Sequence, residues 1–158
     1  MSFTIKTSSS AVPRRTVLRT LLATSAAMLG LPAAPARACE FFCASMRITH
    51  PWTRASAVGA TTALVSMRFD EVTQDDRLIG VTTPMAAGAE LMGVGAGGSA
   101  RPVDLSVKAG ETLEFAETGI HIRLTGLHRP MEMACTYPLT LTFEKAGVVE
   151  ADLSVDYA

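Results

Sequence analysis

The sequence predicts an all-β fold, an antiparallel β-sandwich, on three observations. Apolar and polar residues alternate in several short stretches, and no stretch after residue 38 shows the 3.6-residue period of an amphipathic helix. Glycine, proline or paired aspartate separates these stretches about every ten residues, which is typical of a β-sandwich. Residues 39–158 are also long enough to enclose a hydrophobic core without help from a metal or a disulfide.

The first strands are expected at residues 46–50, 61–69 and 78–82. In the third of these, the alternation places Leu78 and Val81 on opposite faces. The second has one clearly apolar face, formed by Ala63, Val65, Met67 and Phe69.

The later part of the chain continues the same pattern. In residues 121–127, Ile122 and Leu124 alternate with His121 and Arg123, which predicts one apolar and one polar face. A short helical turn is expected within Met85–Met92, and the glycine-rich segment Gly93–Ser99 is expected to connect two strands of a hairpin. Strands are expected at residues 103–107, 113–115, 121–127, 139–143 and 149–155.

Residues 1–38 differ from the rest of the chain and predict an export signal. They hold five basic residues and no acid, with an apolar stretch over residues 17–31 and small residues at the end. The pair Arg14-Arg15 resembles the twin-arginine motif, and an ordinary secretory signal with a chance arginine pair is the alternative. Cleavage is expected after Ala38, which places the mature domain, residues 39–158, in the bacterial periplasm. Lipid attachment at Cys39 is not expected, because the preceding residues lack the usual leucine.

Charge excludes several classes of partner. The net charge of −1 divides into +5 on residues 1–38 and −6 on residues 39–158, where nine basic residues face fifteen acidic ones. An acidic domain is unsuited to nucleic acid or to an anionic membrane surface, both of which need basic residues. The apolar stretch of the leader is too short and too often interrupted to span a membrane, so the mature chain is expected to have no transmembrane segment.

The cysteines are Cys39, Cys43 and Cys135, an odd number for an exported protein. In an extended chain the Cα atoms of Cys39 and Cys43 would lie roughly 13 Å apart, too far for a disulfide. We therefore expect Cys43 to pair with Cys135, unless the chain turns between the first two cysteines. A pair of thiolates holding Cu(I) or Zn(II) is the alternative.

No motif of an enzyme is present, so the sequence predicts a protein without catalytic activity. It lacks a G-x-S-x-G turn, an H-E-x-x-H helix and a convincing pair of carboxylates. Residues 39–158 do contain six methionines besides histidine and cysteine, and thioether and imidazole together suit Cu(I). Most of these methionines are equally well explained as core residues. This explanation is weakest for Met131 and Met133, which lie two apart in a loop that follows a proline.

Four segments resemble the PCu(A)C family of periplasmic copper chaperones, in order and at suitable spacing. They are ITHPWTRA at Ile48–Ala55, DRLIGVTTP at Asp76–Pro84, GIHIRLTGLHRP at Gly119–Pro130 and PLTLTFEKAGVV at Pro138–Val149. The resemblance implies a cupredoxin-like β-sandwich of Greek-key type. It also implies copper binding and delivery, with a copper-accepting subunit of a membrane oxidase or another copper chaperone as partner.

The family's ligands form an H-x-M pair, a further Met and a second H-x-M pair. At the corresponding positions this chain has Met92 and Val94 for the first pair, Ala100 for the single Met, and His121 and Arg123 for the second. The resemblance therefore implies a remodelled Cu(I) site centred on His121 and Met92. Arginine has no lone pair to donate and carries a positive charge.

Two hypotheses follow from this altered motif. In the first, His121 and Met92 bind Cu(I) with help from other soft residues: Cys39, Cys43, Met131, Met133 or His128. In the second, the domain has lost its metal and serves as a β-sandwich interaction module. His121 is then an ordinary strand histidine and Met92 a packed one.

Overall fold

The computed structural model describes residues 39–95 and 97–157, and these residues form strands and no helix. The leader expected in residues 1–38 lies outside the described residues. The strands are β1 (Glu40–Phe42), β2 (Arg47–Arg54), β3 (Thr62–Asp70), β4 (Asp76–Thr82), β5 (Ala86–Val94), β6 (Ala100–Pro102), β7 (Leu105–Val107), β8 (Leu113–Glu114), β9 (His121–Leu127), β10 (Thr136–Phe143) and β11 (Gly147–Tyr157).

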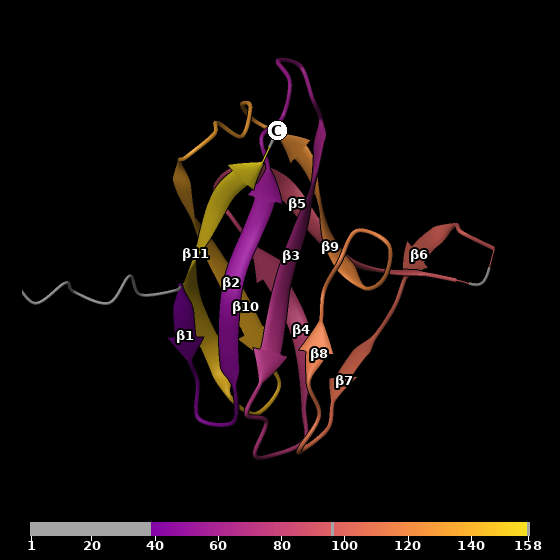
Figure 1. The fold of residues 1–158 in the computed structure, drawn as a ribbon, viewed down its shortest axis with the longest axis vertical. Coiled ribbons are helices and arrows are strands. Elements are labelled where there is room, and N and C mark those ends of the chain that lie inside the picture. The colour runs from indigo at the N-terminus through magenta and orange to yellow at the C-terminus, as the bar shows by residue number, and fades with distance from the viewer. Residues whose placement is uncertain (1–38, 96, 158) are drawn as a thin grey trace, which may run out of the picture. The chain divides into compact units, whose positions relative to one another are not determined.

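The strands form one curled sheet in the order β6-β5-β9-β3-β2-β11-β10-β4-β7, with β1 added to β2 and β8 added to β3 (Figure 1). The all-β prediction is confirmed. The expectation of a purely antiparallel sheet needs one correction, because β11 pairs with β2 in parallel. The sheet curls far enough for β4 to contact β5, so that its concave side encloses the core.

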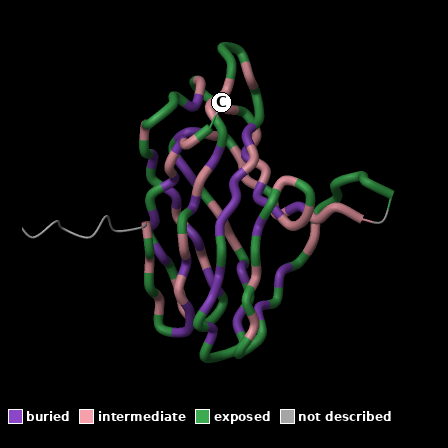
Figure 2. The backbone as a smooth tube through the Cα atoms, in the orientation of Figure 1, coloured by how far each residue is buried: buried purple, intermediate pink, exposed green. Residues whose placement is uncertain are grey.

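The core is built from the apolar faces of these strands. Buried and exposed positions alternate along the backbone in Figure 2, as a sheet with one face toward a core requires. Phe69 lies at the centre, with its ring 4.8 Å from that of Phe115 and 5.6 Å from that of Phe143. The alternation predicted in residues 61–69 and 121–127 is confirmed, since Val65, Phe69, Ile122 and Leu124 are all fully buried.

Two local predictions were wrong. Residues 86–94 form strand β5 instead of a helical turn, because they pair with β9 from Ala86 to Met92. In β4, Leu78 pairs with the buried Phe143 and Val81 with the buried Leu141, and an irregularity in the register lies between these two pairs. This β-bulge turns Leu78 and Val81 to the same side of the sheet, where simple alternation separates them.

The expected disulfide between Cys43 and Cys135 is absent, and all three cysteines are free. Cys43 lines a groove beside Val149, whereas the carbonyl oxygen of Cys135 accepts a hydrogen bond from the N–H of Val155. Val149 and Val155 are separated by about 20 Å along β11. The two thiols therefore lie near opposite ends of one strand. Cys39 and Cys43 flank the extended strand β1, which keeps them apart as well.

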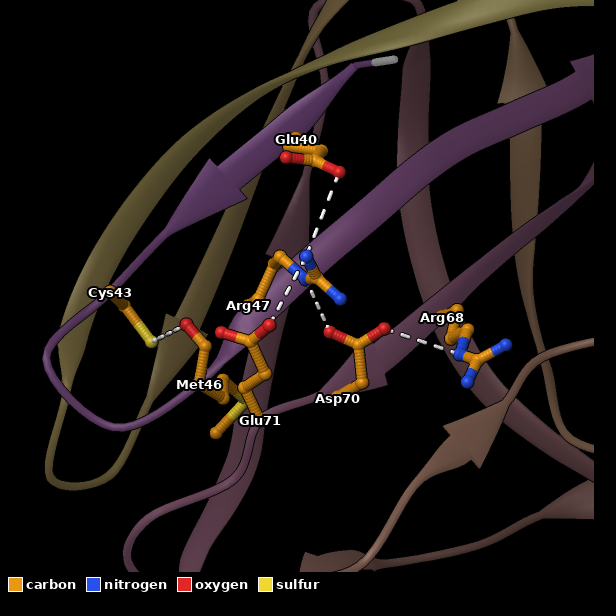
Figure 3. Close-up of polar contacts among 7 residues, drawn as sticks. All are labelled: Glu40, Cys43, Met46, Arg47, Arg68, Asp70 and Glu71. Carbon is orange, nitrogen blue, oxygen red and sulfur yellow. Dashed lines mark hydrogen bonds and ion pairs between the residues drawn. The ribbon is translucent and has the colours of Figure 1, made fainter.

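Ion pairs hold the start of β2 against the end of β3 (Figure 3). Arg47 contacts Asp70 at 2.6 Å, Glu71 at 3.2 Å and Glu40 at 3.8 Å, while Arg68 contacts Asp70 at 3.2 Å. The hydrogen bond from Arg47 lowers the pKa of Asp70, although desolvation acts in the opposite direction. The network stabilises the charged form of a carboxylate that is only slightly exposed.

A second carboxylate, Asp76, joins β4 to the turn between β10 and β11. Its oxygens accept hydrogen bonds from the backbone N–H groups of Arg77, Lys145 and Ala146, at 2.8 to 2.9 Å. Burial alone would raise the pKa of Asp76, but the three N–H donors and Lys145 outweigh it, and the pKa is lowered. Asp76 is thus an ionised group whose role is structural.

Candidate metal centre

Met92 on β5 and His121 on β9 are directly opposite each other in the antiparallel pairing of these strands. Directly opposed residues on neighbouring strands have Cβ atoms about 5 Å apart and point to the same face. The two residues that the sequence predicts as metal ligands are therefore brought together by the sheet itself. A thioether sulfur and an imidazole nitrogen are within reach of one ion.

The pair lies on the side of the sheet that faces away from the core. On β9, Ile122 and Leu124 point into the core. His121 directly precedes Ile122, and because successive residues of a strand point to opposite faces, His121 points away from the core. Both members are nevertheless buried, with 1% of Met92 and 3% of His121 exposed. Met92 is buried without being part of the core cluster. Its burial therefore has to come from chain that covers the outer face.

The segment before β9 contacts β5, His121 and β2. The carbonyl oxygen of Gly119 accepts a hydrogen bond from the N–H of Val94 at 3.3 Å, which attaches the segment to β5. The same oxygen lies 3.2 Å from Nδ1 of His121. At its other side, Glu117 forms an ion pair with Arg54 at 2.8 Å. The segment thus extends the pairing of β9 with β5 as far as Gly119 and contacts β2 through Glu117.

The contact with Gly119 sets the tautomer of His121. A carbonyl oxygen can only accept, so Nδ1 must carry the proton and donate. The lone pair is then on Nε2, the nitrogen left for a metal. A backbone carbonyl bonded to the other ring nitrogen is the usual way in which proteins orient a ligating histidine.

A second pair of residues stands beside the first on the same face. Glu90 is opposite Arg123, and their side chains form an ion pair of 2.6 Å. The positive charge of Arg123 would by itself repel a bound cation. In the structure this charge is balanced by the Glu90 carboxylate at contact distance. Glu90 was missed in the sequence, since only the register between β5 and β9 shows that it faces Arg123.

The other motif positions supply no donor side chain. Val94 and Ala100 are paired with each other between β5 and β6, at the places where the family has methionines. In the described residues, no group of three or more His, Cys, Asp or Glu side chains is arranged to hold a metal. Of the motif positions, only those of Met92 and His121 therefore carry a side chain able to donate to a metal.

The proposed helper residues lie elsewhere. His128 follows the far end of β9, about 23 Å from His121 along the extended strand. Met133 and Cys135 belong to the loop between β9 and β10 at that same end, and Met131 is a core residue with 1% exposure. Cys43 lines the groove beside β11, and the carbonyl oxygen of Cys39 accepts a hydrogen bond from the backbone N–H of His50. The structure does not bring these residues to the Met92–His121 pair.

Two comparisons of the sequence with known proteins give one match. A family sequence model described as "Putative lipoprotein LpqE-like" matches residues 46–155. A search of curated protein sequences gives no match. Among the residues that the structure describes, no helix has the length and apolarity needed to cross a membrane.

Solved structures of PCuAC domains have a similar fold. The apo PCuAC domain of PmoF1 is 23% identical, with a TM-score of 0.68 over 75% of this chain and 99% of that one. The copper-bound PCuAC domain of PmoF2 is 26% identical, with a TM-score of 0.67 over 75% and 98%. The Cu(I) form of DR1885 from Deinococcus radiodurans is 23% identical, with a TM-score of 0.59 over 85% of each chain. The expected cupredoxin-like β fold is confirmed.

Proposed function

The chain belongs to the LpqE-like family, and on that premise we propose that it is an exported copper-binding protein that carries Cu(I) between Met92 and His121. The observation that carries the proposal is the direct opposition of these two residues on β5 and β9, both buried outside the core. The similar PCuAC domain of PmoF2 is described as copper-bound, and that of DR1885 as a Cu(I) form.

The donor set suits the monovalent ion. Met92 and His121 are both neutral, and thioether and imidazole are soft and intermediate ligands that favour Cu(I) over harder cations. Cu(I) also tolerates a low number of ligands, so two protein donors suffice to hold it. The role is binding and transfer, without a catalysed reaction.

A site with two donors also favours transfer. An acceptor that offers additional sulfur or nitrogen ligands can take the ion without first displacing many bonds. We propose a copper-accepting subunit of a membrane oxidase, or another copper chaperone, as that acceptor. Because Met92 and His121 are 1% and 3% exposed, entry and exit of the ion require a movement of the side chains or loops that bury them.

Export is the second half of the proposal. We propose that residues 1–38 direct the chain through the twin-arginine route to the periplasm and are removed before Cys39. The family description names a lipoprotein, and Cys39 is the residue that would carry the lipid. The preceding Ala36-Arg37-Ala38 favours an unmodified mature N-terminus. Mass spectrometry of the mature protein distinguishes a free Cys39 from a lipidated one.

An anaerobic titration with Cu(I) against a competing chelator tests the function. The protein should have Cys39, Cys43 and Cys135 changed to Ser, because free thiolates bind Cu(I) on their own. We expect one Cu(I) per chain, with an affinity at least tenfold lower in His121→Ala and unchanged in the control His128→Ala. No binding in the Cys-free parent would favour the metal-free interaction module instead.

A further inference from the structure

The Glu90–Arg123 ion pair is the feature nearest to the Met92–His121 pair that the proposed function does not use. Glu90 is two residues before Met92 on β5, and Arg123 is two residues after His121 on β9. All four side chains therefore project from the same face, in two adjacent cross-strand pairs. Positions two apart on a strand are separated by about 7 Å, within reach of a flexible glutamate side chain.

Glu90 is a potential metal ligand that is already occupied. Its carboxylate accepts a hydrogen bond from a terminal guanidinium nitrogen of Arg123 at 2.6 Å. A free carboxylate beside a thioether and an imidazole would complete a three-donor site with one hard, anionic oxygen. Hard oxygen and nitrogen donors are those that Cu(II) prefers, in a four-cornered arrangement.

The guanidinium of Arg123 is in turn in contact with Glu90. Nε of Arg123 is buried and has no hydrogen-bond partner among the described residues. The strand register places Arg123 beside the metal pair, and Glu90 is the one carboxylate that its partly exposed guanidinium contacts among the described residues. Arginine stays protonated at all relevant pH values, so this positive charge is permanent.

We propose that Arg123 acts as a charge lock: it holds the Glu90 carboxylate away from the metal and makes the Met92–His121 pair select Cu(I) over Cu(II). This inference rests on the proposed function, since it concerns the same pair. Two neutral donors are enough for Cu(I), whereas Cu(II) lacks the oxygen ligand that Arg123 holds. Arg123 is a specificity-determining residue, and Glu90 is the ligand that it withholds.

The test compares the affinities for Cu(II) and Cu(I) in the Cys-free background, because thiols would reduce Cu(II). In Arg123→Ala the ratio of Cu(II) affinity to Cu(I) affinity should rise at least tenfold. Adding Glu90→Gln to Arg123→Ala should abolish that gain, and Arg123→Lys should keep the parent ratio. Arg77→Ala, which breaks the 3.3 Å ion pair with Glu144 on another part of the surface, is the matched control and should change nothing.

Electron paramagnetic resonance of bound Cu(II) supplies a second readout. The spectrum of Arg123→Ala should show an oxygen-rich site that is lost in the double variant. An unchanged ratio in Arg123→Ala, or a gain that survives Glu90→Gln, overturns the lock while leaving Cu(I) binding intact. Failure of the parent to bind Cu(I) overturns the proposed function and the lock together. Should Arg123→Ala not fold, as judged by thermal unfolding, Arg123→Gln carries the same expectations.

Discussion

Two buried polar sites in this domain differ in how far the protein satisfies their hydrogen-bonding capacity. Asp76 is 5% exposed and receives three backbone N–H groups, with the hydroxyl of Ser45 at 3.5 Å. His121 is 3% exposed, and its ring has one hydrogen bond in the described part of the chain, to Gly119. Its neighbour Met92 offers a sulfur that is only a weak acceptor.

The difference separates a structural site from a binding site. A buried group whose bonding capacity is used up by the protein fixes the fold, because removing it leaves its partners without hydrogen bonds. A buried pair that keeps a nitrogen lone pair and a thioether sulfur in reserve contributes to the fold mainly through packing, and its free donors are suited to an incoming ion. Substitutions should therefore affect stability at Asp76 and metal affinity at Met92 and His121.

The largest effect is expected for Asp76→Ala. Three backbone N–H groups would lose their acceptor, and we expect the free energy of unfolding to fall by about 3 kcal/mol. Urea denaturation measures this, with the exposed Asp152→Ala as control. Equal stability of the two variants would contradict the structural role of Asp76.

Acid should weaken the domain at Asp76 and at two other aspartates. The pKa values of Asp70, Asp75 and Asp76 are all lowered in the folded protein. Their contribution to stability is therefore complete above the unfolded pKa of about 3.9 and is lost as the pH falls through the folded values. Denaturation at a series of pH values should show this loss. In Asp76→Asn the free energy of unfolding should depend less steeply on pH. A free energy of unfolding that rises on acidification would contradict this prediction.

At the metal pair, Met92→Leu should leave stability nearly unchanged and lower the affinity for Cu(I). The change conserves volume, so we expect the free energy of unfolding to change by less than about 1.5 kcal/mol. Cu(I) affinity should fall at least tenfold, or about 1.4 kcal/mol, because a sulfur ligand is lost. Met133→Leu, at the far end of β9, is the control for general loss of methionine. Unchanged affinity in Met92→Leu would exclude this residue as a ligand.

The smallest effect is expected for Arg123→Met. It restores the residue type that the PCu(A)C motif has at this position, and it removes a cation. Since Glu90 already balances that cation, we expect a gain in Cu(I) affinity of about threefold, or ~0.7 kcal/mol. The competition titration in the Cys-free protein resolves this change. A weaker affinity would show that Arg123 supports the pair in a way that a thioether does not replace.

Much of the fold could be predicted because buried and exposed residues alternate along the central strands. β3, β9 and the ends of β10 and β11 have an apolar face that specifies both their existence and their orientation. β5 was mistaken for a turn because it begins with small residues, Ala86-Ala87-Gly88-Ala89, which have no period. β1 and β6 are three residues each, too short to show one.

The metal pair could be predicted only through resemblance to a family, and its surroundings could not. Met92 and His121 are 29 positions apart in the sequence, and their opposition depends on the register between β5 and β9. The same register places Glu90 against Arg123, which no local pattern indicates. The separation of Cys43 from Cys135 likewise depends on the path of β11.

X-ray absorption spectroscopy at the copper edge tests the central claim most directly. The Cys-free protein should be loaded anaerobically with one equivalent of Cu(I). The account predicts one sulfur and one nitrogen scatterer at the copper. It also predicts loss of the nitrogen in His121→Ala and loss of the sulfur in Met92→Leu. A spectrum that stays the same in both variants would contradict a site made by Met92 and His121.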